Sequence, residues 1–297
     1  MNKGRLKGLL SSILQLGKIK ISVPVALTGF LGYLRASGEF NENFFFTFFG
    51  ILFLSMGSST FNQIQERKTD QLMQRTSKRP LPAGRISLHG AILSGLLLAL
   101  SGFILLWLTG YHLAAFIGLF TLGWYNLVYT PLKKVTPFAV LPGALIGALP
   151  PLIGWAAAGA SVFHKEILLI SFFLFIGQMP HYWLLLIKIG DEFKSAGLPV
   201  ITEIFSKRQL RNISFIWIIA AAISVVIFPA AGIMNSLLMA FILLGGVICF
   251  LLLMFIRSYR IEIMKNWRPA FITVNLFYLF IILVLIGDKL IEMYLYV

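Results

Sequence analysis

Residues 43–80 read NFFFTFFGILFLSMGSSTFNQIQERKTDQLMQRTSKRP. The first part is apolar over a length that crosses a bilayer as a helix, and amide, acidic and basic side chains follow it at once. Asn62, Glu66 and Asp70 recur at four-residue intervals, so on a continuing helix their oxygen atoms lie on one face. The stretch therefore predicts a membrane-spanning helix whose polar end carries chemistry.

The composition extends this prediction to the whole chain. It is 58% hydrophobic and 12% charged, with a mean hydropathy of +0.87, whereas a soluble domain carries about 25% charged residues. We therefore expect an all-α polytopic membrane protein, with residues 1–297 forming one integral-membrane domain. Nine apolar runs predict spans at about 19–36, 43–65, 88–109, 111–132, 137–159, 165–189, 210–231, 235–256 and 270–291.

The distribution of basic residues sets the expected orientation. If the N-terminus is cytoplasmic, only Arg35, Lys165 and Lys289 of the 25 Lys and Arg lie on the opposite side. Because this is the positive-inside pattern, we expect a multi-pass membrane protein with a cytoplasmic N-terminus and an external C-terminus. The net charge of +14 is then topological, and no nucleic-acid partner is expected. The N-terminus lacks the pattern of a removable signal peptide.

Two loops, 66–87 and 188–209, mix acids with bases at the predicted cytoplasmic ends of spans. Four spans separate them, which suggests two four-helix halves followed by a ninth helix. The polar chemistry is then expected at one face of the membrane. Cys249, the single cysteine, lies in a predicted span and is expected to be a buried, inert thiol.

The fifth predicted span is rich in proline and glycine. It contains Pro137, Pro142, Pro150 and Pro151 with several glycines among them. Proline kinks helices, and small residues let neighbouring helices approach closely. A packing kink and a bent helix lining a cavity both fit this pattern, and the two are compatible.

Two carboxylates and an amide on one helix face suit a hard divalent cation. Mg²⁺ takes oxygen ligands and commonly bridges to phosphate. The basic residues Arg75, Lys78 and Arg79 follow closely and could neutralise the remaining charge of a polyphosphate. The alternative is an ordinary loop helix with solvated charges, and the spacing alone leaves both open.

A second polar cluster follows the sixth predicted span. Asp191 and Glu192 lie at its end, with Lys188 one turn before them. Two acid-bearing helix ends could share a diphosphate, although a solvated helix end is the simpler interpretation. His181 precedes Asp191 by ten residues, so it lies about 15 Å deeper, as a packing residue or as a contact for an acceptor.

These segments resemble the intramembrane prenyltransferases of the UbiA superfamily, and within it the protohaem IX farnesyltransferases. The first family signature is matched by Asn62, Glu66, Asp70, Met73, Arg75, Thr76, Arg79, Pro80 and Leu81. The second is matched by Pro180, His181, Tyr182, Trp183, Asp191, Glu192, Phe193, Ala196, Gly197 and Pro199. Matches between them include Tyr129, Thr130, Lys133, Thr136, Pro137, Gly143, Gly147 and 150–155, so the similarity covers roughly residues 17–200.

The resemblance implies nine helices around a central cavity that opens at the cytoplasmic face. It implies that a farnesyl group passes from farnesyl diphosphate to a vinyl group of haem b, and that water then traps the resulting cation to give haem O. Haem b is thus a substrate, and Mg²⁺ is the cofactor. Beyond the surrounding lipid bilayer, haem-handling or oxidase-assembly proteins are further candidate partners.

The resemblance also implies residue roles. The catalytic residues and Mg²⁺ ligands would be Asn62, Glu66, Asp70 and Asp191. Diphosphate contacts would come from Arg75, Lys78, Arg79 and Lys188. The remaining substrate contacts would be Tyr129, His181, Tyr182, Trp183 and Glu192, with the aromatic rings facing the cation and His181 near the haem.

Four positions depart from the family pattern. Glu66 stands where the family has Asp, and Lys68 where it has a further acid. Ala139 replaces a frequent Asn, and Ser195 stands where other branches place a second Asp. Glu66 still offers a Mg²⁺ ligand, one methylene farther out.

Two other functions remain open. One is a UbiA-type prenyltransferase acting on another acceptor, such as a quinone precursor or aromatic acid. The other is a transporter or lipid-binding membrane protein that uses these acids as an ion or proton site. Transporter sites usually lie near the bilayer midplane, whereas these acids are expected at helix ends.

Overall fold

The computed structural model describes residues 3–259 and 267–295, and all regular structure in them is helical. The long helices are α1 (Lys3–Leu16), α2 (Ile19–Ser37), α3 (Glu42–Leu72), α4 (Leu88–Leu108), α5 (His112–Gly123), α7 (Val140–Ala157), α8 (Lys165–Ser195), α9 (Lys207–Ala230), α10 (Leu237–Tyr259) and α12 (Trp267–Leu295). Shorter elements are η1 (Trp124–Tyr129), α6 (Thr130–Leu132), η2 (Pro137–Ala139) and η3 (Ile201–Glu203). The all-α prediction is confirmed.

Nine segments within the described residues are long and apolar enough to cross a membrane, and each overlaps a predicted span. Helices α3 and α8 run farthest past their predicted ends of 65 and 189, because α3 continues to Leu72 and α8 to Ser195. Residues 66–72 contain no Pro or Gly and are mostly strong helix formers. The turn that carries Glu66 and Asp70 is therefore a direct extension of the apolar helix.

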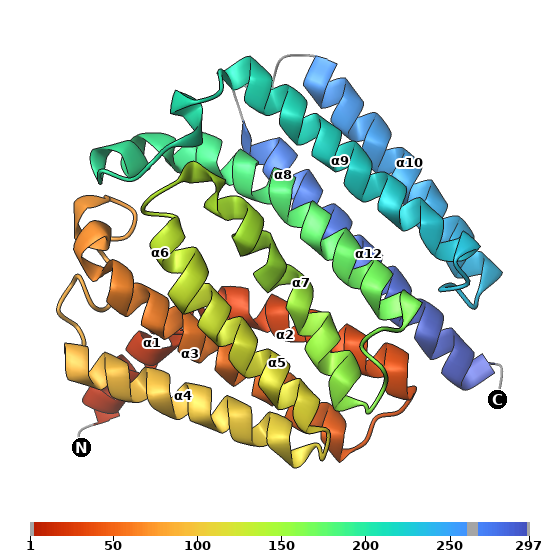
Figure 1. The fold of residues 1–297 in the computed structure, drawn as a ribbon, viewed down its shortest axis with the longest axis horizontal. Helices are drawn as coiled ribbons and strands as arrows, with labels where there is room; N and C mark the ends of the chain where they lie inside the picture. Colours follow the sequence, from red (N-terminus) through yellow and green to blue (C-terminus); the bar gives the residue numbers. More distant parts are fainter. Residues whose placement is uncertain (1–2, 260–266, 296–297) are drawn as a thin grey trace.

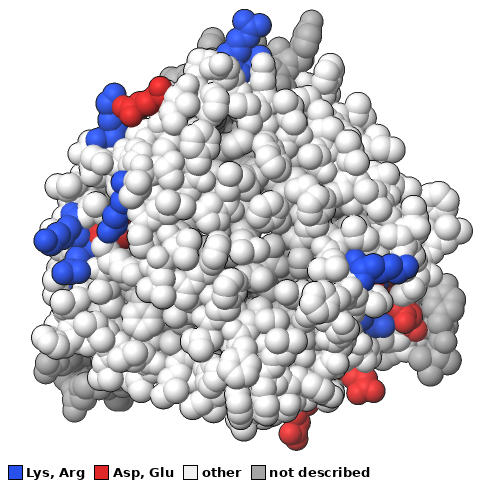
Figure 2. Space-filling model, viewed as in Figure 1, with Lys and Arg blue, Asp and Glu red and all other residues white. Residues whose placement is uncertain are grey.

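The long helices run back and forth between two ends of a bundle (Figure 1). We call one the basic end; it comprises the α1–α2 junction and the loops 73–87, 133–136 and 196–206. The far end comprises the loops 38–41, 109–111, 158–164 and 231–236. Figure 2 shows charged atoms near the margins of the molecule and an uncharged expanse between them, which is the surface that a multi-pass membrane protein presents to lipid.

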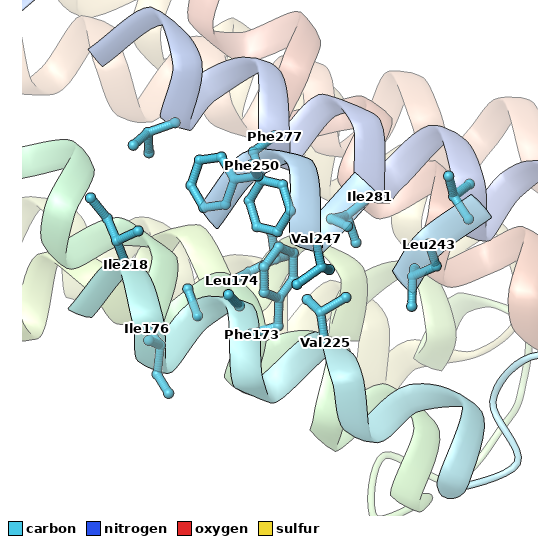
Figure 3. Close-up of a cluster of buried hydrophobic side chains, with 14 of the residues drawn as sticks. Phe173, Leu174, Ile176, Ile218, Val225, Leu243, Val247, Phe250, Phe277 and Ile281 are labelled. Atoms are coloured by element: carbon cyan, nitrogen blue, oxygen red, sulfur yellow. The ribbon is translucent and has the colours of Figure 1, made fainter. Parts of the chain in front are cut away.

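The buried apolar side chains form two main clusters. One joins α2, α3, α4, α5 and α7 around residues such as Tyr33. The other joins α8, α9, α10 and α12 around Phe173, and Figure 3 shows the rings of Phe250 and Phe277 lying face to face within it, 3.9 Å apart between centroids. The division falls after the fifth span rather than after the fourth, because α7 packs on α2 and α5 as well as on α8.

Helix α7 is the central element, and its small residues serve both close packing and the lining of a cavity. Gly154 lies against the backbone carbonyl of Gly29 in α2, and a Cβ on Gly154 would collide with that oxygen. The same helix lines a cavity with Gly143, Gly147 and Pro150. Small residues therefore serve close packing on one side of α7 and leave open space on another.

Cys249 is not buried, and the expectation from the sequence was wrong. It is exposed on α10. The buried stripe of α10 consists of Leu243, Val247, Phe250 and Met254, which recur at helical spacing. Cys249 lies off this stripe because α10 is an outer helix with one face packed against the bundle.

A buried cluster of charges ties the far end together. Arg35 of α2 donates from Nη1 to Oδ2 of Asp288 at 2.8 Å and from Nε to Oε1 of Glu166 at 2.5 Å. Asp288 also accepts from the backbone N–H of Ser236 at 2.8 Å. Helices α2, α8 and α12 and the loop before α10 thus meet at one fully paired site, where an uncompensated charge would be costly.

This cluster generates a stability prediction. Asp288→Ala removes the fully buried one of the two carboxylates that pair with Arg35, so we expect a loss of about 3–5 kcal/mol in the free energy of unfolding. Denaturant titration of the detergent-solubilised protein measures it. The control is Glu39→Gln at an exposed position of the same end, where we expect a change within about 0.5 kcal/mol. Equal midpoints for the two variants would contradict a structural role for the cluster.

Candidate active site

Asn62, Glu66 and Asp70 form one buried polar face of α3, which we call the oxygen face. Their exposed fractions are 1%, 6% and 0%. Lys68, between them in sequence, is exposed on the opposite side of the helix. The shared face expected from the four-residue spacing is confirmed, and the basic residue that replaces a family acid points away from it.

A cation contacts each member of the oxygen face. Lys18 donates from Nζ to Oδ1 of Asn62 at 2.9 Å. Arg79 donates from Nη1 to both carboxylate oxygens of Asp70, at 2.9 and 2.7 Å. Lys133 forms an ion pair with Glu66. Because buried acids need such partners, three separate segments of the chain must converge on this helix end.

A tight turn after α3 returns Arg79 to the helix it has just left. Thr76 donates from Oγ1 to the backbone carbonyl of Asp70 at 2.9 Å, and the N–H groups of Thr76 and Ser77 donate to the carbonyl of Met73. These bonds satisfy carbonyls that the helix end leaves open. The side chain nine residues after Asp70 is thereby brought back to it.

A widened helical turn positions Lys133. Residues 124–129 form a π-helix, and Pro131, which follows it, has no N–H to continue a regular hydrogen-bond ladder. The carbonyl of Asn126 accepts from Nε2 of Gln65 at 3.0 Å, and the hydroxyl of Thr130 accepts from Nδ2 of Asn62 at 3.1 Å. The π-helix is thus anchored to α3, which places Lys133 beside Glu66.

Lys18 was not singled out from the sequence. It lies between α1 and α2 with a φ of 47°, a left-handed conformation that only this non-glycine residue adopts in the described chain. Burial away from bulk water, reinforced by the Arg79 guanidinium, lowers the pKa of Lys18 to about 7. In the sequence, only its position directly before the first apolar run marked Lys18. A basic residue at that position is also explained by the positive-inside rule, so it did not point to the site.

Glu66 and Asp70 of the oxygen face line a cavity of about 750 Å³ that reaches from the basic end into the bundle, whereas Asn62 is not part of the lining. Its charged lining residues are six basic and two acidic: Lys18, Lys20, Arg75, Arg79, Lys133 and Lys134 against Glu66 and Asp70. This surplus of positive charge is suited to a polyanion. Away from the charged residues, the lining is mainly apolar and aromatic.

Tyr129 and Tyr182 lie next to one another in the cavity wall, with 6.3 Å between ring centroids. Nζ of Lys133 lies 5.8 Å from the centroid of the Tyr129 ring. Gly143 of α7 makes room for this ring, because a Cβ there would approach its carbon atoms to 2.7 Å. The π faces are therefore available at the boundary between the charged mouth and the apolar interior.

His181 faces the cavity and contacts residues of α12. The sequence motifs, which end near residue 200, had not connected this helix with the site. Its Nδ1 lies 3.0 Å from Oδ1 of Asn275, and its ring centroid lies 4.9 Å from that of Phe271. Tyr278 donates from its hydroxyl to the carbonyl of Gly177, one turn away on α8, at 2.7 Å. A polar Asn within an apolar span was the signal that could have identified Asn275.

Several predicted residues lie elsewhere. Trp183 is buried among Val140, Ala144 and Met179, and does not line the cavity. Lys78 is exposed and outside the cavity lining. Lys188 belongs to α8, but its side chain lies outside the described part of the structure.

The acids after the sixth span are also separated from the oxygen face. Asp191 is exposed and does not line the cavity. Glu192 approaches the first cluster instead, with Oε2 at 3.8 Å from Nε of Arg75. Across residues 3–259 and 267–295, no group of three or more His, Cys, Asp or Glu side chains is placed to hold a metal. The oxygen face, with two carboxylates and one amide, is the candidate set of oxygen ligands.

Comparison with known proteins agrees with the resemblance found in the sequence motifs. The UbiA prenyltransferase family matches residues 22–282. A protoheme IX farnesyltransferase of Geobacter sulfurreducens is 38% identical over 185 residues, which cover 62% of this chain and 68% of that relative. One from Bdellovibrio bacteriovorus is 30% identical over 283 residues, which cover 94% of this chain and 95% of the relative.

Solved structures share the fold at low sequence identity. A digeranylgeranylglyceryl phosphate synthase aligns with a TM-score of 0.76 at 17% identity, over 95% of this chain and 98% of the other. A UbiA homologue from Archaeoglobus fulgidus, bound to GPP and Mg²⁺, aligns with a TM-score of 0.64 at 15% identity, over 94% and 98%. With the family match over most of its length and a nearly full-length relative at 30% identity, this chain belongs to the UbiA prenyltransferase family.

Proposed function

We propose that this protein transfers a farnesyl group from farnesyl diphosphate to a vinyl group of haem b, with addition of water, to give haem O. The observation that carries the proposal is the junction of a buried oxygen face and a surplus of cations with an aromatic-lined apolar cavity. A diphosphate ester of an isoprenoid has the same division into a charged head and an apolar tail. The names of the sequence relatives supply the acceptor.

The oxygen face fits a divalent metal. Its donors are two carboxylates and an amide oxygen, which suit Mg²⁺, and their contacts with Lys18, Arg79 and Lys133 support a site that accepts positive charge. Asn62, Glu66 and Asp70 would hold the ion. Mg²⁺ bound there would neutralise charge on the diphosphate as it leaves.

The basic residues prepare the mouth of the cavity for the leaving group. When the bond between C1 of the farnesyl group and the diphosphate oxygen breaks, the electron pair leaves with the oxygen. Arg79 and Arg75 offer guanidinium N–H groups to that developing charge, and Lys18 and Lys133 add two more cations beside it. Because Lys18, Arg79 and Lys133 are held by the oxygen face before substrate arrives, little reorganisation of these cations accompanies bond cleavage.

The interior then protects the allylic cation. The π faces of Tyr129 and Tyr182 line the cavity and stabilise positive charge, while the apolar wall keeps bulk water away. The vinyl group of the acceptor forms the new carbon–carbon bond and becomes the cation. One water molecule adds its oxygen to that carbon and loses a proton, which completes the hydroxyethylfarnesyl group.

Asp191, Glu192 and Lys188 complete the proposed head-group site from the side of α8. Their assignment rests on the family resemblance. The contact between Glu192 and Arg75 supports an approach of this helix end to the diphosphate mouth. Asp191 is exposed and outside the cavity lining, so its proposed metal contact would require its side chain to turn toward the oxygen face.

We further propose that the basic end faces the bacterial cytoplasm. The positive-inside distribution of Lys and Arg supports this orientation. It would place the diphosphate mouth where soluble isoprenoid diphosphates are available, with the far end outside.

The decisive assay uses purified protein with farnesyl diphosphate, haem b and Mg²⁺. We expect a haem product with the mass of haem O, release of diphosphate, and loss of both when the metal is chelated. Asp70→Asn and Asp191→Asn should each lower turnover by about a hundredfold or more, because each removes a carboxylate that we propose as a ligand of the Mg²⁺ that neutralises the leaving diphosphate. Mass spectrometry of the extracted pigment measures this.

The same assay separates the alternatives. Prenylation of a quinone precursor or an aromatic acid, with haem b unchanged, would replace the proposed acceptor. Diphosphate release from neither mixture would reject the enzymatic proposal altogether.

A second prediction concerns Arg79. Arg79→Met should lower kcat/KM for farnesyl diphosphate roughly tenfold to hundredfold, because one charged hydrogen bond is worth about 1.5–3 kcal/mol. Lys68→Met is the matched control, since Lys68 is exposed two residues before Asp70, and we expect it to stay within about twofold. A similar loss in both variants would mean that general surface charge, rather than the Arg79 contact, attracts the substrate.

A further inference from the structure

His181 presents its ring to the cavity where Pro180 removes one hydrogen bond from the continuous helix α8. Pro180 precedes it and has no N–H for the carbonyl one turn earlier. The neighbouring carbonyl of Gly177 accepts from the hydroxyl of Tyr278 instead. Helix α12 therefore closes over the weakened turn of α8, and His181 and Asn275 meet across that contact.

The amide of Asn275 can adopt one orientation here. Its Nδ2 donates to the backbone carbonyl of Phe271 at 2.6 Å. A flipped amide would press its own oxygen against that carbonyl, and two acceptors would repel one another. Oδ1 therefore faces His181.

The orientation of Asn275 determines the tautomer of His181. Because an amide oxygen only accepts, Nδ1 of His181 carries the hydrogen and donates it at 3.0 Å. The hydrogen bonds and ion pairs of the described residues bring no carboxylate to this ring. Nε2 is then left with its lone pair, on a ring that lines the cavity.

We propose that Nε2 of His181 is an axial ligand to the iron of a porphyrin substrate, and that Asn275 is the positioning residue that orients it. An imidazole whose other nitrogen donates to a fixed oxygen is the usual arrangement for a ligand to haem iron. The inference rests on the proposed function, since it concerns the acceptor, and it adds a residue of α12 to the site.

The surroundings suit a flat, apolar ligand. The rings of Phe271, Tyr182 and Tyr278 line the same part of the cavity as His181. A bond through the iron holds the centre of the macrocycle and leaves the vinyl groups at its edge free to react. Axial coordination would therefore position the acceptor without occupying the reacting carbon.

Titration of the purified protein with ferric protoporphyrin IX tests the proposal. We expect the absorption and electron paramagnetic resonance spectra of histidine-ligated iron for the wild-type protein. His181→Leu should remove that signature and weaken binding at least tenfold, and Asn275→Leu should weaken it about tenfold while the signature survives in part. Metal-free protoporphyrin IX should bind the wild-type protein and both variants alike, which also shows that the variants are folded.

Two further measurements isolate coordination from packing. In His181→Gly, added imidazole should restore the spectrum of ligated iron. His89→Leu removes an exposed His at the basic end and should leave the spectrum unchanged. An unaltered spectrum in His181→Leu, or equal losses for iron and metal-free porphyrin, would overturn the ligand assignment.

The outcome is distinguishable from failure of the proposed function. If the protein forms haem O but His181→Leu retains the ligated spectrum, the acceptor is correct and the ligand is wrong. If the wild-type protein neither binds porphyrin nor prenylates haem b, both proposals fail.

Discussion

The structure of the basic end depends on neutralising two acids that the fold buries. Glu66 and Asp70 lie on the inner face of a helix that has just crossed the apolar layer, where an unpaired carboxylate would cost several kcal/mol. Their partners are Arg79, from the turn after α3, and Lys133, which directly follows α6, while Lys18 from the α1–α2 junction holds the neighbouring amide. Electrostatic pairing thus determines where three otherwise independent segments meet.

The apolar part of the bundle follows a different rule. Within a bilayer, helices gain little from the hydrophobic effect on association, so close packing and a few polar contacts hold them together. Here the close packing is the approach of α7 to α2 through Gly154 and Gly29. The polar contact is the Arg35 cluster at the far end. Between these packed regions and the paired acids remains the cavity, which combines a cationic mouth with an aromatic interior.

Much of the candidate site could be predicted because helical periodicity is a local property. The shared face of Asn62, Glu66 and Asp70 follows from their spacing, and it survives the extension of α3 beyond the apolar run. Predictions weakened where a helix ends or where two helices meet. The sequence did not indicate which side of α8 Asp191 faces, and the structure exposes it. Trp183 packs against α7 instead of facing the cavity.

Hydropathy and residue spacing act within one segment, so they were enough to predict the membrane class, the nine spans found among the described residues, and the polar end of α3. Tertiary structure decided which cations meet the acids, and which side of α12 meets His181. Lys18 and Asn275 are 44 and 94 residues from their partners along the chain, so no local pattern connects them. Pairings of that kind arise when whole helices pack, since only packing brings distant side chains within hydrogen-bonding distance.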